Sequence, residues 1–194
     1  MTDPESASAA SVSPESPAFS LRPARADDAA PLHTLAAETF PLACPPHTTA
    51  EAIADFIATH LSVDSFMGYL ADPDRALFVA ESGGGLVGYT MLVFTDPTDP
   101  DVAAAVTTRP TAELSKVYVR EGSHGGGVAS QLVTRSVEEA RQHGSRSVWL
   151  GVNQLNARAN RFYEKQGFVL VGTKRFLVGG QYEDDFVREL MLRA

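Results

Sequence analysis

A glycine cluster between a strand-like segment and a helix-like segment constrains the fold of this chain more than any other feature. The cluster lies in residues 124–129 (HGGGVA) and follows an apolar run at 112–119 that is rich in residues favoured in strands. Apolar side chains then recur at helical spacing from about 127 to 143. The free N–H groups of such a loop and helix end can bind a pyrophosphate. A tight turn without a ligand is the alternative, since neither a P-loop nor a GxGxxG fingerprint is present.

A second segment, downstream of the glycine cluster, has the spacing of an amphipathic helix. In NARANRFYEKQGF (156–168), Asn156, Ala159 and Tyr163 are separated by three and four residues. Such positions lie on one face of a 3.6-residue repeat, so we expect a helix at 156–166. A strand at 147–152 separates it from the helix that follows the glycine loop. Strand, helix, strand and helix in this order predict at least one parallel crossover.

The remaining segments predict a mixed α/β sheet with an antiparallel front. Helices are expected at about 28–40, 49–61 and 63–71, and strands at 76–82, 86–94, 168–178 and 184–190. Thr48 and Glu51 have capping-box spacing and predict the start of the second helix. The stretch 95–110 carries aspartates among prolines and is interpreted as an exposed loop.

Composition limits the class of protein. A chain of 194 residues, 44% of them hydrophobic, can bury the core of one domain, which we expect at 19–194. Residues 1–18 offer little apolar surface and predict a disordered tail. The net charge of −8 argues against nucleic-acid binding and favours a cationic substrate. A single cysteine, and the lack of a signal-like start or of an apolar run of about 20 residues, predict a cytoplasmic protein without membrane partners.

The two opening segments resemble the signatures of the GNAT superfamily of acetyl-CoA-dependent N-acetyltransferases. That family has Arg/Gln-x-x-Gly-x-Gly/Ala after a strand, and residues 124–129 match it except that His124 replaces the Arg or Gln. Its second signature, Asn-x-x-Ala-x-x-Phe-Tyr-x-Lys-x-Gly-Phe, is matched in full at 156–168. The fragments AETF, AELSKVYV, VWLGV and GTKRFLVGGQYEDDFV are most similar to bacterial spermidine/spermine N-acetyltransferases.

The resemblance implies a fold and a set of site residues. The fold would be a mostly antiparallel sheet with one splayed parallel pair, flanked by helices. The pyrophosphate of acetyl-CoA would bind the backbone of six residues, namely His124, Gly125, Gly126, Gly127, Val128 and Ala129. The backbone of Val117, Tyr118 and Val119 would pair with the pantetheine amides, which Asn156 would also contact. Tyr163 would be the general acid. Glu113, on the same strand as Val117, Tyr118 and Val119, would be the general base.

Simpler interpretations of these residues stay open. Tyr163 could pack the helix against the sheet, Asn156 could cap that helix, and Glu113 could be a solvated carboxylate. No metal is expected, because the five histidines lack ligand spacing; they are His33, His47, His60, His124 and His143. Cys44 is expected to be a structural thiol. Four acidic residues could meet a cationic acceptor, namely Glu38, Asp96, Asp99 and Asp101.

We therefore expect an enzyme that moves an acetyl group from acetyl-CoA to a small primary amine by direct attack, with a polyamine as a narrower hypothesis. Protein, peptide and antibiotic amines are alternative acceptors. A non-catalytic sensor of acyl-CoA is an alternative of another class, favoured only by His124. The residues leave open whether the chain acts alone or as a homodimer.

Overall fold

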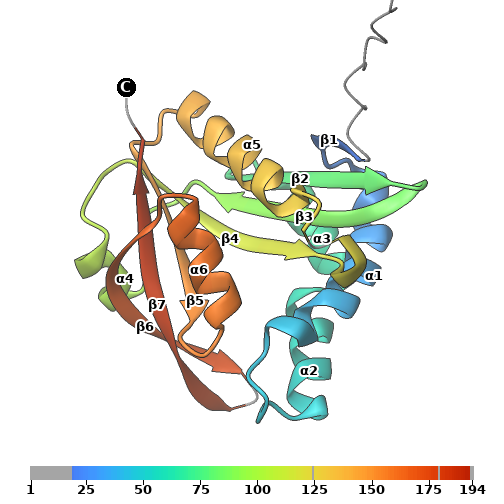
Figure 1. Ribbon diagram of the computed structural model, residues 1–194, viewed down its shortest axis with the longest axis horizontal. Coiled ribbons are helices and arrows are strands. Elements are labelled where there is room, and N and C mark those ends of the chain that lie inside the picture. The colour runs from blue at the N-terminus through green and yellow to red at the C-terminus, as the bar shows by residue number, and fades with distance from the viewer. Residues whose placement is uncertain (1–18, 124, 179, 193–194) are drawn as a thin grey trace, which may run out of the picture.

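Seven strands form one mixed sheet in the computed structural model, which describes residues 19–123, 125–178 and 180–192 (Figure 1). The strands are β1 (Ser20–Pro23), β2 (Arg75–Ser82), β3 (Gly85–Val93), β4 (Thr111–Val119), β5 (Ser147–Asn153), β6 (Val169–Val178) and β7 (Gln181–Met191). Their order in the sheet is β1-β2-β3-β4-β5-β7-β6. Every neighbouring pair is antiparallel except β4 and β5, which confirms the expected fold class.

The parallel pair β4–β5 opens like a V. The two strands pair at Thr111–Ser147, Ala112–Val148 and Glu113–Trp149, and within the described chain they do not pair beyond that point. Each strand remains fixed on its other side, because β4 pairs with β3 up to Val119 and β5 pairs with β7 up to Asn153. The gap between them therefore stays open in the middle of the sheet.

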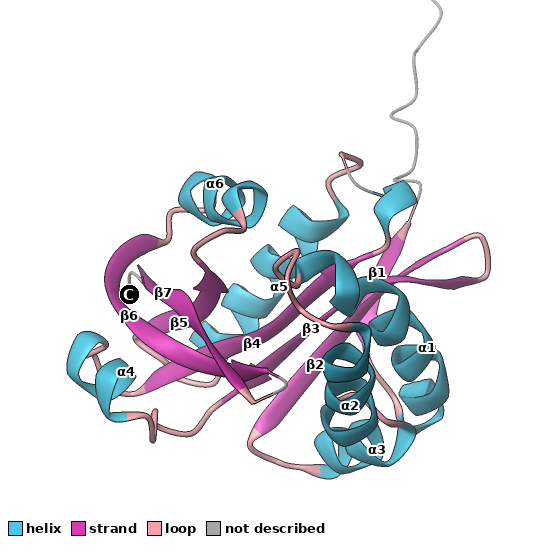
Figure 2. Ribbon diagram, turned by 90° about the horizontal axis from the view of Figure 1, so that it is seen from below, coloured by secondary structure: helices cyan, strands magenta, loops and turns pink. Residues whose placement is uncertain are grey.

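Helices cover both faces of the sheet (Figure 2). One face carries α1 (Ala29–Thr39), α2 (Ala50–His60) and α3 (Val63–Ala71), and the other carries α5 (Val128–Gln142) and α6 (Ala157–Lys165). Short 3-10 turns lie at Ala26–Asp28, Phe40–Ala43 and Glu121–Ser123. No helix in the described ranges is long and apolar enough to cross a membrane.

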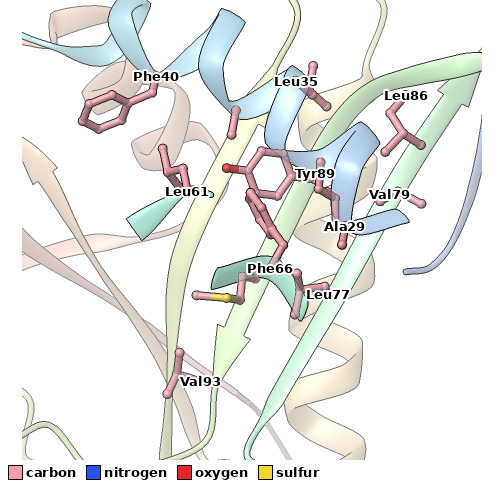
Figure 3. Close-up of a cluster of buried hydrophobic side chains, with 13 residues drawn as sticks. Ala29, Leu35, Phe40, Leu61, Phe66, Leu77, Val79, Leu86, Tyr89 and Val93 are labelled. Carbon is pink, nitrogen blue, oxygen red and sulfur yellow. The ribbon is translucent and has the colours of Figure 1, made fainter. Parts of the chain in front are cut away.

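The first core lies between α1, α3 and the strands β2 and β3 (Figure 3). Leu32, Leu35 and Ala36 of α1 are almost fully buried, as their helical spacing predicts. Phe66 of α3 meets Tyr89 of β3 edge-to-face, with ring centroids 5.6 Å apart. On the opposite face α5 buries Leu132, Val133 and Ala140. Each large apolar side chain buried in this way contributes about 1.5–3 kcal/mol to folding.

The cap of α2 differs by one residue from the prediction. Thr49, and not Thr48, is the N-cap: its backbone is extended and its hydroxyl accepts a hydrogen bond from the amide of Ala52 at 3.1 Å. Thr48 Oγ1 is buried and has no hydrogen-bond partner in the described structure. Two adjacent threonines have equal capping propensity, so sequence spacing alone could not distinguish them.

The expectation of an exposed loop at 95–110 is wrong. This segment contains α4 (Pro100–Ala105), which Asp99 caps by accepting hydrogen bonds from the amides of Asp101 and Val102 at 2.9 and 3.2 Å. Val102 and Val106 are fully buried and pack on Trp149. Aspartate followed by proline is typical of a helix start as well as of a loop, and the short alanine run gave no helical period. The tail predicted at 1–18 lies outside the described residues.

Candidate functional site

Two cavities meet at the gap between β4 and β5. The first, here called the glycine-loop cavity, has a volume of about 420 Å³ and lies between the glycine loop, α5 and α6. The second, here called the carboxylate cavity, has a volume of about 230 Å³ and lies toward α2 and the β6–β7 hairpin. Both are lined by Ala43, Val117, Tyr118, Asn156, Ala159 and Tyr163. A group bound in one cavity can therefore touch a group bound in the other.

The backbone of the glycine loop forms one end of the glycine-loop cavity. Gly125 and Gly127 have φ angles of 84° and 79°, left-handed values that strain any residue with a Cβ. Gly127 is the N-cap of α5, and its carbonyl accepts the first helical hydrogen bond, from Gln131, at 3.0 Å. The amides before Gln131 have no intrahelical acceptor, and Ala129 and Ser130 line the cavity. Free amides at the start of a helix are a favourable place for an anion, and the pyrophosphate site stays a prediction.

The residues predicted at 124–129 to bind the pyrophosphate differ in how they face the glycine-loop cavity. The Val128 side chain is 3% exposed and packs in the core with Leu132, so only its backbone can serve a ligand. Gly126 is exposed but is not among the lining residues of the glycine-loop cavity. The prediction for His124 falls on a residue outside the described ranges.

The charges of the glycine-loop cavity suit a polyanion. Arg158 and Lys165 are its charged lining residues, and no carboxylate lines it within the described part of the chain. The N-terminal end of α5 adds a partial positive charge to these two cations. The protein as a whole is acidic, with a net charge of −8, so this cationic lining is a local feature.

Tyr163 lies in the wall that both cavities share. Its side chain is 9% exposed and packs edge-to-face on Phe162 and Phe168, with ring centroids 5.2 and 5.8 Å away. Burial raises the pKa of Tyr163 above its usual value, so the hydroxyl is protonated at neutral pH. It can therefore donate a proton to a group at the junction of the two cavities.

Buried polar contacts fix α6, and with it Tyr163, against the sheet. Asn156 caps α6 by accepting a hydrogen bond from the amide of Ala159 at 3.0 Å, as the simpler interpretation of that residue predicted. Asn160 donates to the carbonyl oxygens of Asn153 and Asn156, both at 3.0 Å. Its side-chain oxygen accepts a hydrogen bond from Arg188 of β7 at 3.0 Å. The sequence analysis did not single out Asn160, because its role depends on a partner 28 residues away.

Glu113 lies at the closed end of the V, opposite Trp149. Burial raises the pKa of its carboxyl group, while the nearby cations Lys174, Lys116 and Arg75 act in the opposite direction. Burial also lowers the pKa of Lys116 to about 8, against the attraction of Glu113. Glu113 is therefore a half-buried carboxylate among cations, and it lines the carboxylate cavity.

The sequence analysis missed the acidic residues of β7. Glu183 and Asp185 are 9% and 7% exposed and line the carboxylate cavity with Lys174 of β6. Burial raises the pKa of Asp185 to about 6, and the positive charge of Lys174 opposes this shift. Glu183 contacts Nε2 of His47 at 2.7 Å. The sequence DD at 184–185 suggested only a strand, so no local signal marked these residues.

Aromatic rings complete the carboxylate cavity. Phe56 of α2 stacks on Phe40 with centroids 4.4 Å apart and meets Phe176 of β6 edge-to-face at 5.7 Å. Cys44 also lines this cavity, and burial raises the pKa of its thiol to about 11. The thiol is therefore protonated at neutral pH, as expected for a structural cysteine and not for a nucleophile.

The acidic residues proposed for the acceptor lie elsewhere. Glu38 pairs with Arg120 at 2.8 Å, Asp96 pairs with Arg109 at 3.2 Å, and Asp99 caps α4. None of these, nor Asp101, lines the carboxylate cavity. No group of three or more His, Cys, Asp or Glu residues placed to hold a metal ion occurs among the residues with described positions.

Sequence comparison agrees with this architecture. Residues 31–168 match the acetyltransferase (GNAT) family, and the chain belongs to that family. The expected superfamily is thus confirmed, and the protein is an enzyme of the acetyltransferase class. An uncharacterized N-acetyltransferase of Mycobacterium tuberculosis is 46% identical over 166 residues, a match that covers 84% of this chain and 99% of the relative.

Solved structures share the fold at low sequence identity. The PaiA N-acetyltransferase of Thermoplasma acidophilum, crystallised with coenzyme A, has a TM-score of 0.71 and 18% identity over 90% of this chain and 99% of its own. The spermidine/spermine N-acetyltransferase SpeG of Vibrio cholerae, crystallised with manganese, has a TM-score of 0.60 and 20% identity over 89% of this chain and 92% of its own. At these identities the likeness concerns the fold alone.

Proposed function

We propose that this protein transfers an acetyl group from acetyl-CoA to a primary amine. The observation that carries the proposal is the gap between β4 and β5, where a cationic cavity and an acidic cavity share the wall that contains Tyr163. Acetyl-CoA would occupy the glycine-loop cavity and the amine the carboxylate cavity. The thioester and the amine nitrogen would then meet at the gap, as a direct transfer requires.

Each part of acetyl-CoA has a fitting group in the glycine-loop cavity. The pyrophosphate would bind the amides of residues 124–129 and the N-terminal end of α5, with Arg158 and Lys165 nearby. The pairing of β4 with β5 covers Thr111, Ala112 and Glu113, and the strands diverge after that point. The backbone of Val117, Tyr118 and Val119 on the edge of β4 that faces the gap would pair with the amides of the pantetheine arm. Asn156 would contact the same arm beside its own helix cap.

The transfer needs a proton acceptor and a proton donor. The amine attacks the thioester carbonyl only as the neutral base, so a carboxylate of the cavity must first accept its proton; by resemblance this residue would be Glu113. The departing thiolate of coenzyme A would take a proton from Tyr163. A direct attack needs no covalent enzyme intermediate, and Cys44 with its raised pKa is a poor nucleophile.

The narrower proposal for the acceptor is a polyamine. Glu183 and Asp185 place negative charge beside the rings of Phe56 and Phe176, and carboxylates with aromatic faces are what a polycation prefers. Lys116 and Lys174 line the same cavity and offset part of this negative charge, so the net negative charge of the cavity is small.

We also propose residues 19–194 as the transferase domain, preceded by a tail at 1–18.

A turnover assay with calorimetry tests the proposal. The protein is incubated with acetyl-CoA and separate panels of polyamines, peptides and aminoglycosides while free thiol is measured. Release of coenzyme A that depends on one class of amine supports the transferase and identifies the acceptor class. No turnover with spermidine or spermine contradicts the polyamine. Tight binding of acetyl-CoA in the calorimeter without turnover of any amine would indicate a sensor instead.

A further inference from the structure

The carboxylate cavity contains a second carboxylate that is better placed than Glu113. We infer that Asp185 of β7 binds the ammonium group of the acceptor and accepts its proton, an inference that rests on the proposed function. Neither the sequence signatures nor the general-base position on β4 pointed to this residue. Asp185 differs from Glu113 in strand register, in the charged groups around it and in its position beside Lys174 above Gly151.

Strand register places Asp185 at the height of the junction and Glu113 below it. Glu113 belongs to the last paired position of β4 and β5, where the V is closed. Four residues further along, β5 reaches Asn153, about 13 Å from the closed end at about 3.3 Å per residue. The pairing of β4 with β3 shifts between Leu114 and Lys116, so Val117 lies three β3 positions from Glu113, roughly 10 Å from the closed end. Asn153 pairs directly with Asp185. The backbone of Asp185 therefore lies at least as far from the closed end as Val117, which lines both cavities, whereas Glu113 lies at the closed end.

The neighbours of the two carboxylates agree with this difference. Asp185, Tyr118 and Tyr163 all line the carboxylate cavity, and the charge of Asp185 helps to raise the pKa of Tyr118. Lys174 acts on both carboxylates, but Glu113 also interacts with two further cations, Lys116 and Arg75. A carboxylate surrounded by cations is a weaker base, because its charged form is already stabilised.

The end of the Lys174 side chain occupies the space above Gly151, beside Asp185. A Cβ at Gly151 would lie 2.7 Å from Cε of Lys174, 3.4 Å from its Nζ and 3.4 Å from Oδ2 of Asp185. The lysine ammonium and the Asp185 carboxylate thus approach the same point above β5, so this carboxylate already faces a cation. The bound acceptor would displace the end of the Lys174 side chain and place its own ammonium beside the same carboxylate oxygen.

The Asp185 carboxylate removes a proton from the ammonium, and the neutral nitrogen forms a bond to the thioester carbonyl carbon. The carbon–sulfur bond then breaks and the thiolate leaves. The thiolate takes the hydroxyl proton of Tyr163, and the tyrosinate recovers a proton from the amide nitrogen. Asp185 finally releases its proton to solvent, so one ammonium and one thioester give one amide, one thiol and one proton.

Ionisation of Asp185 gives the reaction a pH dependence. With a pKa of about 6, the Asp185 carboxylate is charged at pH 7 and becomes protonated as the pH falls through 6. A protonated carboxyl group cannot accept the proton of the ammonium, so kcat/KM for the amine should decline below pH 6. Seven charged or titratable groups share the carboxylate cavity with Asp185, namely Lys174, Glu183, Glu113, Lys116, Tyr118, Tyr163 and Cys44. His47 contacts Glu183, and Asp184 acts on Asp185 from the other face of β7.

The decisive experiment compares three single variants with the wild type, using the amine that the panel assay turns over fastest. Asp185→Asn should lower kcat/KM for that amine by roughly 100- to 1,000-fold and abolish the acid limb. Glu113→Gln should lower it by less than about tenfold and keep the limb. Asp184→Asn is the matched control, because Asp184 is exposed on the other face of the same strand, and its activity should stay within about twofold of wild type.

Calorimetry with acetyl-CoA shows whether each variant is folded, since all three should keep the wild-type affinity. The inference is wrong if folded Asp185→Asn keeps more than about a third of the activity with an unchanged acid limb, or if Glu113→Gln causes the larger loss. A wild-type protein that acetylates no amine would overturn the proposed function itself. An active wild type with an active Asp185→Asn variant overturns only the role of Asp185.

Discussion

The glycine-loop cavity and the carboxylate cavity differ in how the chain builds them. The first includes the backbone of the glycine loop and the start of α5, together with residues of β4 and α6, and its charged side chains are the two cations Arg158 and Lys165. The second is formed by side chains from α2, β4, β5, β6 and β7, including acidic and basic groups with shifted pKa values. Backbone contacts tolerate side-chain change, whereas the second cavity can change its ligand with one substitution. The cavity proposed for the cofactor should therefore be general, and the cavity proposed for the acceptor should be particular to this protein.

The largest expected effect in the glycine-loop cavity comes from its backbone. Gly127→Val places a β-branched residue at a φ of 79°, which costs on the order of 1–3 kcal/mol and misdirects the first amides of α5. The affinity for acetyl-CoA, measured by calorimetry, should fall on the order of a hundredfold. Gly122→Ala is the control, because Gly122 does not have a left-handed φ and a Cβ there meets no atom within 4 Å. Equal affinities of the two variants would mean that the loop backbone does not bind the cofactor.

Tyr163 belongs to both cavities, so its removal tests whether they act together. Tyr163→Phe keeps the ring packing on Phe162 and Phe168 and removes only the hydroxyl. We expect kcat to fall by roughly 10- to 100-fold while the affinity for acetyl-CoA stays near normal. Steady-state kinetics with calorimetry provide the two measurements. Unchanged turnover would remove Tyr163 from the mechanism.

Lys174 lines the carboxylate cavity and not the glycine-loop cavity. Its charge lowers the pKa of Asp185, so Lys174→Met should raise that pKa and move the acid limb of kcat/KM upward by roughly one unit from about 6. The rate at pH 8 should change little by comparison. Arg175→Met is a matched control, since Arg175 is exposed and adjacent on β6. An acid limb that stays at the same pH in Lys174→Met would show that ionisation of Asp185 does not control the rate.

Glu38 should matter least, although the sequence suggested it for the acceptor. Its exposed pair with Arg120 is worth less than about 1 kcal/mol. Glu38→Gln should therefore alter kcat/KM for the amine by less than about twofold in the same assay. A tenfold loss would extend the acceptor site beyond the carboxylate cavity and weaken the contrast between the two cavities.

The same contrast explains what the sequence could predict. The strand order around the glycine loop, the helix at 156–166 and the role of Gly127 depend on neighbours within one segment, so local spacing indicated them. Asp185 faces the gap only because β7 pairs with β5 in one register, and His47 meets Glu183 across 136 residues. Such long-range pairing leaves no local pattern. For the same reason α4, which is held by burial of Val102 on Trp149, was taken for a loop.

The gap between β4 and β5 also has a consequence for the order of substrate binding. The two cavities share part of their lining, but each also has lining residues that the other lacks. Acetyl-CoA and the amine, placed in the two cavities as proposed, would each contact a separate set of residues and would not need the other ligand to be bound first. The steady-state kinetics should then be those of a random sequential mechanism.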